Sequence, residues 1–170
     1  MLRRNLELKA CCASLALARQ RLQPLAPRPG GSESQIDTYF RVQHGRLKLR
    51  EIEGRGACLI GYQRPDEVAA RLSAYHLVPV PDAAPLKAAL TAALGVRGEV
   101  RKCREILHWH NVRVHLDEVA QLGTFLEFEA VLGPDDELAV ARARLEELSQ
   151  LLEIAPGDRL AVSYSDLLGL

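Results

Sequence analysis

The stretch that decides the fold runs from residue 112 to residue 129 and reads VRVHLDEVAQLGTFLEFE. Charged and apolar residues alternate on both sides of a break at residues 121–123, and a period of two residues is typical of β-strands. The charged residues that share the odd-numbered face are Arg113, His115, Asp117, Glu127 and Glu129. The stretch therefore predicts two antiparallel strands, each with one apolar and one charged face.

The same alternation occurs in three other segments. They are 3–9 with Glu7 and Lys9, 46–52 with Lys48 and Arg50, and 99–109 with Lys102 and Arg104. The charges are sorted by sign. Lysine and arginine concentrate on the middle strands, whereas Glu7, Glu127 and Glu129 come from the first and the late strands.

Two arrangements fit these charged faces. An antiparallel sheet with one face on a core usually turns its polar face to water, and charges there need no function. If the sheet closes with its charged faces inward, the cavity holds lysines and arginines beside a carboxylate cluster. The sorting by sign favours the closed arrangement, but the spacing alone leaves both open.

The rest of the chain completes an α+β pattern, a long antiparallel sheet interrupted by helices. Further strands are predicted at 35–42, 57–64 and 67–80, with a short last strand near 160–164. Helices are predicted at 11–22, 83–94 and 135–153. Residues 27–34 are rich in Pro, Gly and Ser and predict a flexible surface loop, suited to a lid.

Composition narrows the class of protein. The 170 residues are 48% hydrophobic and 26% charged, which is ordinary for a soluble domain, so we expect one domain over residues 1–170. Lysine plus arginine number 22 and aspartate plus glutamate number 22, so no net charge attracts the chain to nucleic acid or membrane. Four cysteines without zinc-type spacing, and no apolar stretch of bilayer length, predict a cytoplasmic protein.

The charged faces have side chains suited to phosphate. Because the sequence contains no glycine-rich phosphate loop, side chains would have to bind any phosphate. Lysine and arginine neutralise phosphate, and arginine does so with two parallel hydrogen bonds. Carboxylates supply the oxygen ligands that Mg²⁺ or Mn²⁺ prefers. An inward-facing arrangement would suit a polyanion together with a divalent metal.

Several motifs resemble the CYTH superfamily of triphosphate tunnel enzymes, which includes class IV adenylyl cyclases and thiamine triphosphatases. NLELK at 5–9 is similar to the family's Glu-x-Glu-x-Lys on the first strand. Other stretches are similar to the class IV cyclase branch, namely QIDTYF at 35–40, GRLKLR at 45–50, YQRPD at 62–66, residues 114–129 and SYSDLL at 163–168. The resemblance covers nearly the whole chain.

The resemblance implies an eight-stranded antiparallel closed barrel, or tunnel, with flanking helices, and it implies roles for individual residues. Mg²⁺ or Mn²⁺ would be held by Glu7, Glu127 and Glu129. The triphosphate would be bound by Lys48, Arg50, Arg64, Lys102, Arg104 and Arg113. Lys9 would contact phosphate or, with Tyr39, orient or deprotonate the attacking group, and Asp117 would orient arginines or aid a second metal.

Two residues depart from the family's pattern. Asn5 stands where the family has the first glutamate, which should weaken metal binding or remove one of two metals. Gln63 stands where many relatives have a lysine, so one cation is missing unless Arg64 replaces it. These departures keep a non-catalytic triphosphate-binding or polyphosphate-binding module among the alternatives.

The similarity to the cyclase branch implies conversion of ATP to cyclic AMP and pyrophosphate. The alternative enzyme is a triphosphatase that hydrolyses tripolyphosphate, a nucleoside triphosphate or thiamine triphosphate. We therefore expect a triphosphate-containing small molecule as the partner, with no nucleic acid or membrane, and the resemblance also implies a homodimer. Of the five histidines, only His115 shares a face with Arg113 and Asp117, so it alone is a candidate for the tunnel.

Overall fold

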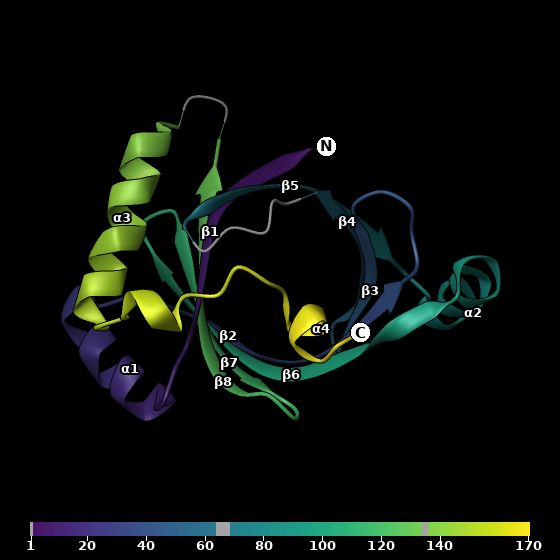
Figure 1. The fold of residues 1–170 in the computed structure, drawn as a ribbon, viewed down its shortest axis with the longest axis horizontal. Helices are drawn as coiled ribbons and strands as arrows, with labels where there is room; N and C mark the ends of the chain where they lie inside the picture. The colour runs from purple at the N-terminus through teal and green to yellow at the C-terminus, as the bar shows by residue number, and fades with distance from the viewer. Residues whose placement is uncertain (1, 64–68, 134–135) are drawn as a thin grey trace.

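The computed structural model describes residues 2–63, 69–133 and 136–170. Its eight strands form a closed antiparallel barrel in the order β1-β5-β4-β3-β2-β6-β7-β8 (Figure 1). The strands are β1 (Arg3–Cys11), β2 (Arg28–Phe40), β3 (Arg46–Ile52), β4 (Gly56–Gln63), β5 (Arg71–Val80), β6 (Val96–Trp109), β7 (Val112–Val119) and β8 (Gly123–Leu132). The expected eight-stranded antiparallel barrel is therefore confirmed.

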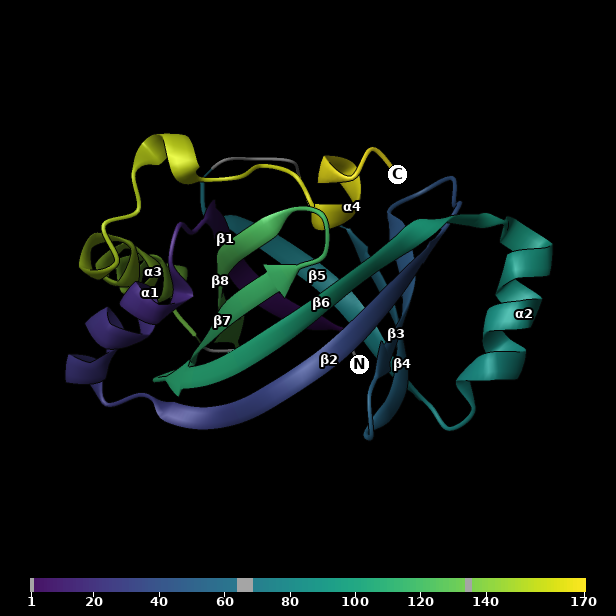
Figure 2. The same ribbon diagram turned by 90° about the horizontal axis from the view of Figure 1, so that it is seen from below.

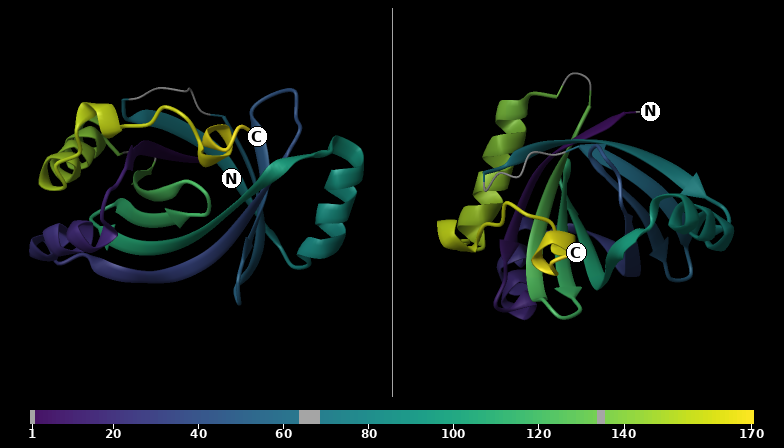
Figure 3. Two further views of the ribbon diagram at one scale, coloured as in Figure 1. Left: turned by 60° about the horizontal axis from the view of Figure 1, so that its bottom comes forward. Right: turned by 45° about the vertical axis from the view of Figure 1, so that its right-hand side comes forward.

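Helices flank the barrel on opposite sides. They are α1 (Leu15–Leu22), α2 (Ala83–Leu94), α3 (Leu138–Leu151) and α4 (Tyr164–Leu167), with short 3-10 turns η1 (Gln23–Leu25) and η2 (Pro156–Asp158). The helices α1 and α3 lie on one side and α2 on the other (Figure 2). The short helix α4 lies across one opening of the barrel (Figure 3). Within the described residues, no helix has the length and apolar character needed to cross a membrane.

The main hydrophobic core lies outside the barrel. Alternation turns Leu6, Leu8, Val114 and Phe128 outward from β1, β7 and β8, where α1 and α3 cover them. All four are at most 2% exposed. Because the apolar faces meet the helices, the opposite faces of the same strands point into the barrel, which settles the inward arrangement of the charged side chains.

Residues 27–34 were expected to form a loop, but residues 28–34 belong to β2, which begins at Arg28. This part of β2 pairs with β6, and its register shifts between Pro29 and Gly31. Pairing with β3 starts only at Gln35, so Pro29 lies where the strand has one neighbour and its missing N–H is tolerated. A Cβ on Gly30 would lie 2.7 Å from His108 Nε2 and 2.8 Å from Ile106 Cγ2, so a larger residue would require these side chains to move.

The expected last strand near 160–164 was also wrong. Only an isolated bridge joins Ala10 to Arg159, and Ser163 then caps helix α4 through a capping box with Asp166. Other helix and strand boundaries differ from the expected ones by a few residues. The strand β1 continues to Cys11, so the first helix begins at Leu15 rather than residue 11. The expected start of the third helix, residue 135, lies outside the described residues.

The external core leads to a prediction about stability. Leu148→Ala on α3 should lower the free energy of unfolding by about 3 kcal/mol, because Leu148 is 0% exposed and its loss leaves a cavity. Leu138→Ala on the same helix should cost less than about 1 kcal/mol, because Leu138 is 42% exposed. Urea unfolding followed by circular dichroism measures both. Equal costs would contradict an outer core between α3 and the barrel.

Candidate functional site

The barrel encloses a cavity of about 300 Å³ lined from all eight strands and from α4. Its described cationic residues are Lys9, Lys48, Arg50, Lys102, Arg104 and Arg113. Its described carboxylates are Glu7, Glu33, Asp37, Glu127 and Glu129. The cavity thus brings together nearly all the residues that the sequence analysis selected for the site, from strands far apart in the chain.

Asp37 on β2 is the centre of one cluster in this cavity. It is 1% exposed and accepts hydrogen bonds from Lys48 Nζ at 2.9 Å, Arg50 Nε at 2.7 Å and Lys102 Nζ at 2.8 Å. Burial alone would raise the pKa of Asp37, but Arg50, Lys102 and Lys48 hold it well below its usual value. One carboxylate therefore fixes three of the predicted phosphate-binding cations.

Burial strongly perturbs the pKa of Lys102, one of the lysines in this cluster. Burial lowers its pKa to about 7, with Arg50 and Arg104 adding repulsion, while Asp37 opposes the change. A single carboxylate shared by three cations cannot compensate fully for removing the ammonium group from water. Lys102 therefore loses its proton near neutral pH when no further anion is bound.

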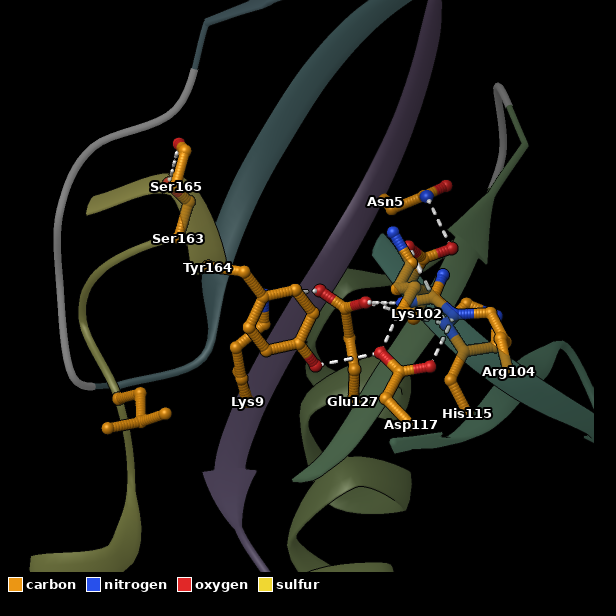
Figure 4. A network of polar contacts seen from close by, with 12 residues as sticks. Asn5, Lys9, Lys102, Arg104, His115, Asp117, Glu127, Ser163, Tyr164 and Ser165 are labelled. Carbon is orange, nitrogen blue, oxygen red and sulfur yellow. Dashed lines mark hydrogen bonds and ion pairs between the residues drawn. The ribbon is translucent and has the colours of Figure 1, made fainter. Parts of the chain in front are cut away.

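A second cluster joins Asp117, Arg104 and Glu127 (Figure 4). Arg104 donates Nε and Nη2 to the two oxygens of Asp117, each at 2.6 Å, and Nη2 also to Glu127 at 2.6 Å. Tyr164 of α4 donates its hydroxyl to Asp117 at 2.7 Å. Burial would raise the pKa of Asp117, but Arg104 lowers it to about 2. Asp117 is thus a fixed anion that orients Arg104.

Lys9 and Tyr39 line the same cavity from β1 and β2. Lys9 Nζ lies 3.2 Å from a Glu127 oxygen and 3.7 Å from the centre of the Tyr164 ring. Lys48 Nζ lies 3.5 Å from the Tyr39 hydroxyl. Burial raises the pKa of Tyr39 far above its usual value, and the nearby Asp37 adds to the rise. The Tyr39 phenol is therefore neutral and suited to orienting a bound group.

The two departures from the family pattern lie in different places. Both side-chain amide atoms of Asn5 have hydrogen-bond partners in one orientation. In it, the nitrogen donates to the Arg4 carbonyl at 2.9 Å and the oxygen accepts from Arg113 Nη2 at 3.0 Å. Arg113 Nη2 also lies 2.7 Å from Glu129. Gln63 is exposed at the end of β4, outside the described cavity lining, and Arg64 lies outside the described residues.

A group of atoms able to hold a metal ion lies where β7 meets β8. His115, Glu127 and Glu129 each offer one ligand atom, and these atoms lie within 4.8 Å of one another. His115 Nδ1 is 3.6 Å from Glu127 and 4.0 Å from Glu129. Glu7 is opposite Glu129 in the β1–β8 register and lines the cavity, but it is not part of this compact group.

The CYTH domain profile matches residues 3–164 of the chain. The chain belongs to the CYTH domain family. No curated protein sequence matches it. This CYTH domain nevertheless shares its fold with several solved structures of low sequence identity.

Three of these structures illustrate the likeness. A Pyrococcus horikoshii OT3 protein has a TM-score of 0.80 and 21% identity, over 96% of this chain and 98% of its own. A Vibrio parahaemolyticus protein proposed to be an adenylate cyclase has a TM-score of 0.76 and 23% identity, over 98% of each chain. HpAC1 from Hippeastrum, a proposed adenylyl cyclase described as having dominant triphosphatase activity, has a TM-score of 0.65 and 15% identity, over 98% of this chain and 93% of its own.

Sequence reasoning missed several polar residues of the site, among them Asp37 and Tyr164. Asp37 has the same parity as Tyr39, which was selected, so the strand period could have found it. Its neighbours Lys48, Arg50 and Lys102 belong to other strands, however, and only the strand register places them around one carboxylate. Tyr164 reaches Asp117 from a helix where the sequence predicted a strand.

The low pKa of Lys102 predicts how stability changes with pH. Between pH 7 and pH 10 an unfolded lysine keeps a proton that the folded Lys102 has lost, so the free energy of unfolding gains a contribution that rises with pH. Lys102→Met should reduce this rise. Lys87→Met is the control, because the hydrogen bonds that Lys87 donates to Glu99 and Glu51 raise its pKa despite partial burial.

Urea unfolding at intervals from pH 7 to pH 9.5 measures both variants against the wild type. We expect a flatter profile only for Lys102→Met. Parallel profiles for Lys102→Met and the wild type would show that Lys102 does not titrate in this range.

Proposed function

We propose that this CYTH protein binds the triphosphate part of a small substrate inside the barrel and cleaves it in a metal-dependent reaction. The observation that supports this most is the convergence of six cationic side chains on one enclosed cavity that also holds a carboxylate cluster. A chain of phosphate groups carries several negative charges over a short length, which matches cations arranged around a cavity.

The residues present suit a divalent metal. Glu127 and Glu129 offer carboxylate oxygens, Glu7 lines the same cavity, and Asn5 offers at most a neutral oxygen. Bound Mg²⁺ or Mn²⁺ would neutralise phosphate charge and polarise the phosphorus–oxygen bond that breaks. The ligand set proposed from the resemblance, Glu7, Glu127 and Glu129, remains our assignment for the carboxylate part of the site.

Ion pairs inside the barrel would change partners when substrate binds. Lys48, Arg50 and Lys102 are held by Asp37, and Arg113 is held by Glu129. An incoming triphosphate competes for these cations, which leaves carboxylate oxygens for the metal. Lys102 gains a proton as the added negative charge raises its pKa, so it contributes a full positive charge only to the complex.

Hydrolysis is the reaction that the cavity supports better. A volume of about 300 Å³ is at the lower end of the range for small-molecule sites, which suits tripolyphosphate or the end of a longer substrate. Water would attack the terminal phosphorus, and the bond to the bridging oxygen would break to release orthophosphate. Lys9, beside Glu127, would orient the attacking group or the phosphate next to it, with Tyr39 as a hydrogen-bond donor.

Cyclisation of ATP is the second candidate, and one feature favours it. Ile52, Leu77 and Ile106 are half-buried, apolar and part of the cavity lining, so they offer a surface for a nucleoside. In this reaction the ribose 3′-hydroxyl attacks the α-phosphorus and pyrophosphate leaves. The same cations and carboxylates would serve either reaction.

Product analysis distinguishes these reactions. The purified protein is incubated with ATP or tripolyphosphate, each with Mg²⁺ or Mn²⁺, and the products are separated by chromatography. Orthophosphate without cyclic AMP is the expected result, whereas cyclic AMP with pyrophosphate would establish the cyclase. Binding by calorimetry without any product would leave a triphosphate-binding module, and Asn5→Glu would then test whether the missing carboxylate limits turnover.

Glu129→Gln should reduce metal-dependent turnover by about 100-fold or more, because a neutral amide replaces a carboxylate of the proposed metal site. The control is Glu118→Gln on β7, an exposed position on the same sheet. Steady-state phosphate release measures both variants, and circular dichroism checks their fold. Near-normal turnover of a folded Glu129→Gln protein would contradict the carboxylate assignment.

A further inference from the structure

We propose that His115 is a nitrogen ligand of the metal, and that the site therefore prefers Mn²⁺ to Mg²⁺. The inference rests on the proposed function of the tunnel and concerns the identity of the metal and its ligands. It starts from one atom, the Nδ1 nitrogen of His115, which is buried and has no hydrogen-bond partner among the described residues.

An unpartnered buried nitrogen of this kind needs an explanation. His115 is 3% exposed, and leaving a buried polar atom unsatisfied costs stability. The unpaired Nδ1 lies 3.6 Å from Glu127 and 4.0 Å from Glu129, beyond hydrogen-bond distance but beside two carboxylates. A cation shared by the three side chains would give His115 Nδ1 the partner that it lacks, and the two carboxylates would balance the charge of that cation.

The fold holds His115 in this position. Its neighbours in sequence, Val114 and Leu116, are 0% and 1% exposed in the outer core, so the alternation of β7 directs His115 inward. On β8, Glu127 is its register partner. On β6 the register partner is Ile106, whose apolar side chain offers no hydrogen bond. The only charged register partner of His115 is therefore a proposed metal ligand.

The chemistry of the ligand atoms determines the preferred metal. Mg²⁺ favours oxygen ligands and keeps several waters, whereas imidazole nitrogen is a common ligand of transition metals. A set of one imidazole and two carboxylates is therefore better suited to Mn²⁺. Asn5 does not compensate, because in the orientation that satisfies its amide the side-chain oxygen accepts a hydrogen bond from Arg113 Nη2.

Pulsed electron paramagnetic resonance of the Mn²⁺-loaded protein tests this directly. A histidine ligand gives a nitrogen coupling at the Mn²⁺ spin, and labelling the histidines with ¹⁵N changes its frequency without altering the protein. We expect this coupling in the wild type and its loss in His115→Leu. His76→Leu, which changes an exposed histidine on the outer face of β5, should keep it.

Binding measured by calorimetry gives a second readout. The dissociation constant for Mn²⁺ should rise by about tenfold or more in His115→Leu, with a smaller change for Mg²⁺. Bound Mn²⁺ without nitrogen coupling in the wild type would overturn the inference and leave the proposed function intact, as would a coupling that survives in His115→Leu. Absence of both metal binding and turnover would instead overturn the proposed function. If His115→Leu does not fold, the labelled wild type still decides whether a histidine is a ligand.

Discussion

Asp37 binds three cations at once, and the rest of the barrel interior depends on the same kind of pairing. A buried charge without a partner is too costly to keep, so each strand that brings a lysine or arginine inward requires a carboxylate from another strand. Asp117 meets this requirement for Arg104, and Glu129 meets it for Arg113. Pairing offsets the cost of removing these charges from water, but the ion pairs contribute little net stability to the fold.

Because the interior is polar, the apolar core must form elsewhere. The outer faces of β1, β7 and β8 pack against α1 and α3, and this core fixes which side chains point inward. The orientation of the apolar face of each strand therefore also fixes the orientation of its charged face. The strand period that buries Phe128 under a helix also points Glu127 and Glu129 into the cavity, so the residues that stabilise the fold also orient the site.

The strand period explains how much of this could be read from the sequence. Lys48, Arg104 and Glu127 could be assigned to the charged faces of their strands because alternation is a local property, whereas the closure that turns those faces inward is not. The meeting of Asp37 with Lys102 depends on the β2–β6 register, which alternation does not specify. Residues 27–34 have the composition of a loop, yet pairing with β6 outweighs that local preference. Tyr164 enters the site because its hydroxyl binds Asp117, a contact between residues 47 positions apart.

The central claim is that cations now paired with carboxylates inside the barrel are those that bind the phosphates. A crystal structure of the protein with tripolyphosphate, without divalent metal, tests it most directly. The account predicts phosphate oxygens inside the barrel within hydrogen-bond distance of Lys48, Arg50 and Arg113, with the Asp37 and Glu129 ion pairs lengthened or broken. Tripolyphosphate bound only outside the barrel, with every internal ion pair unchanged, would contradict it.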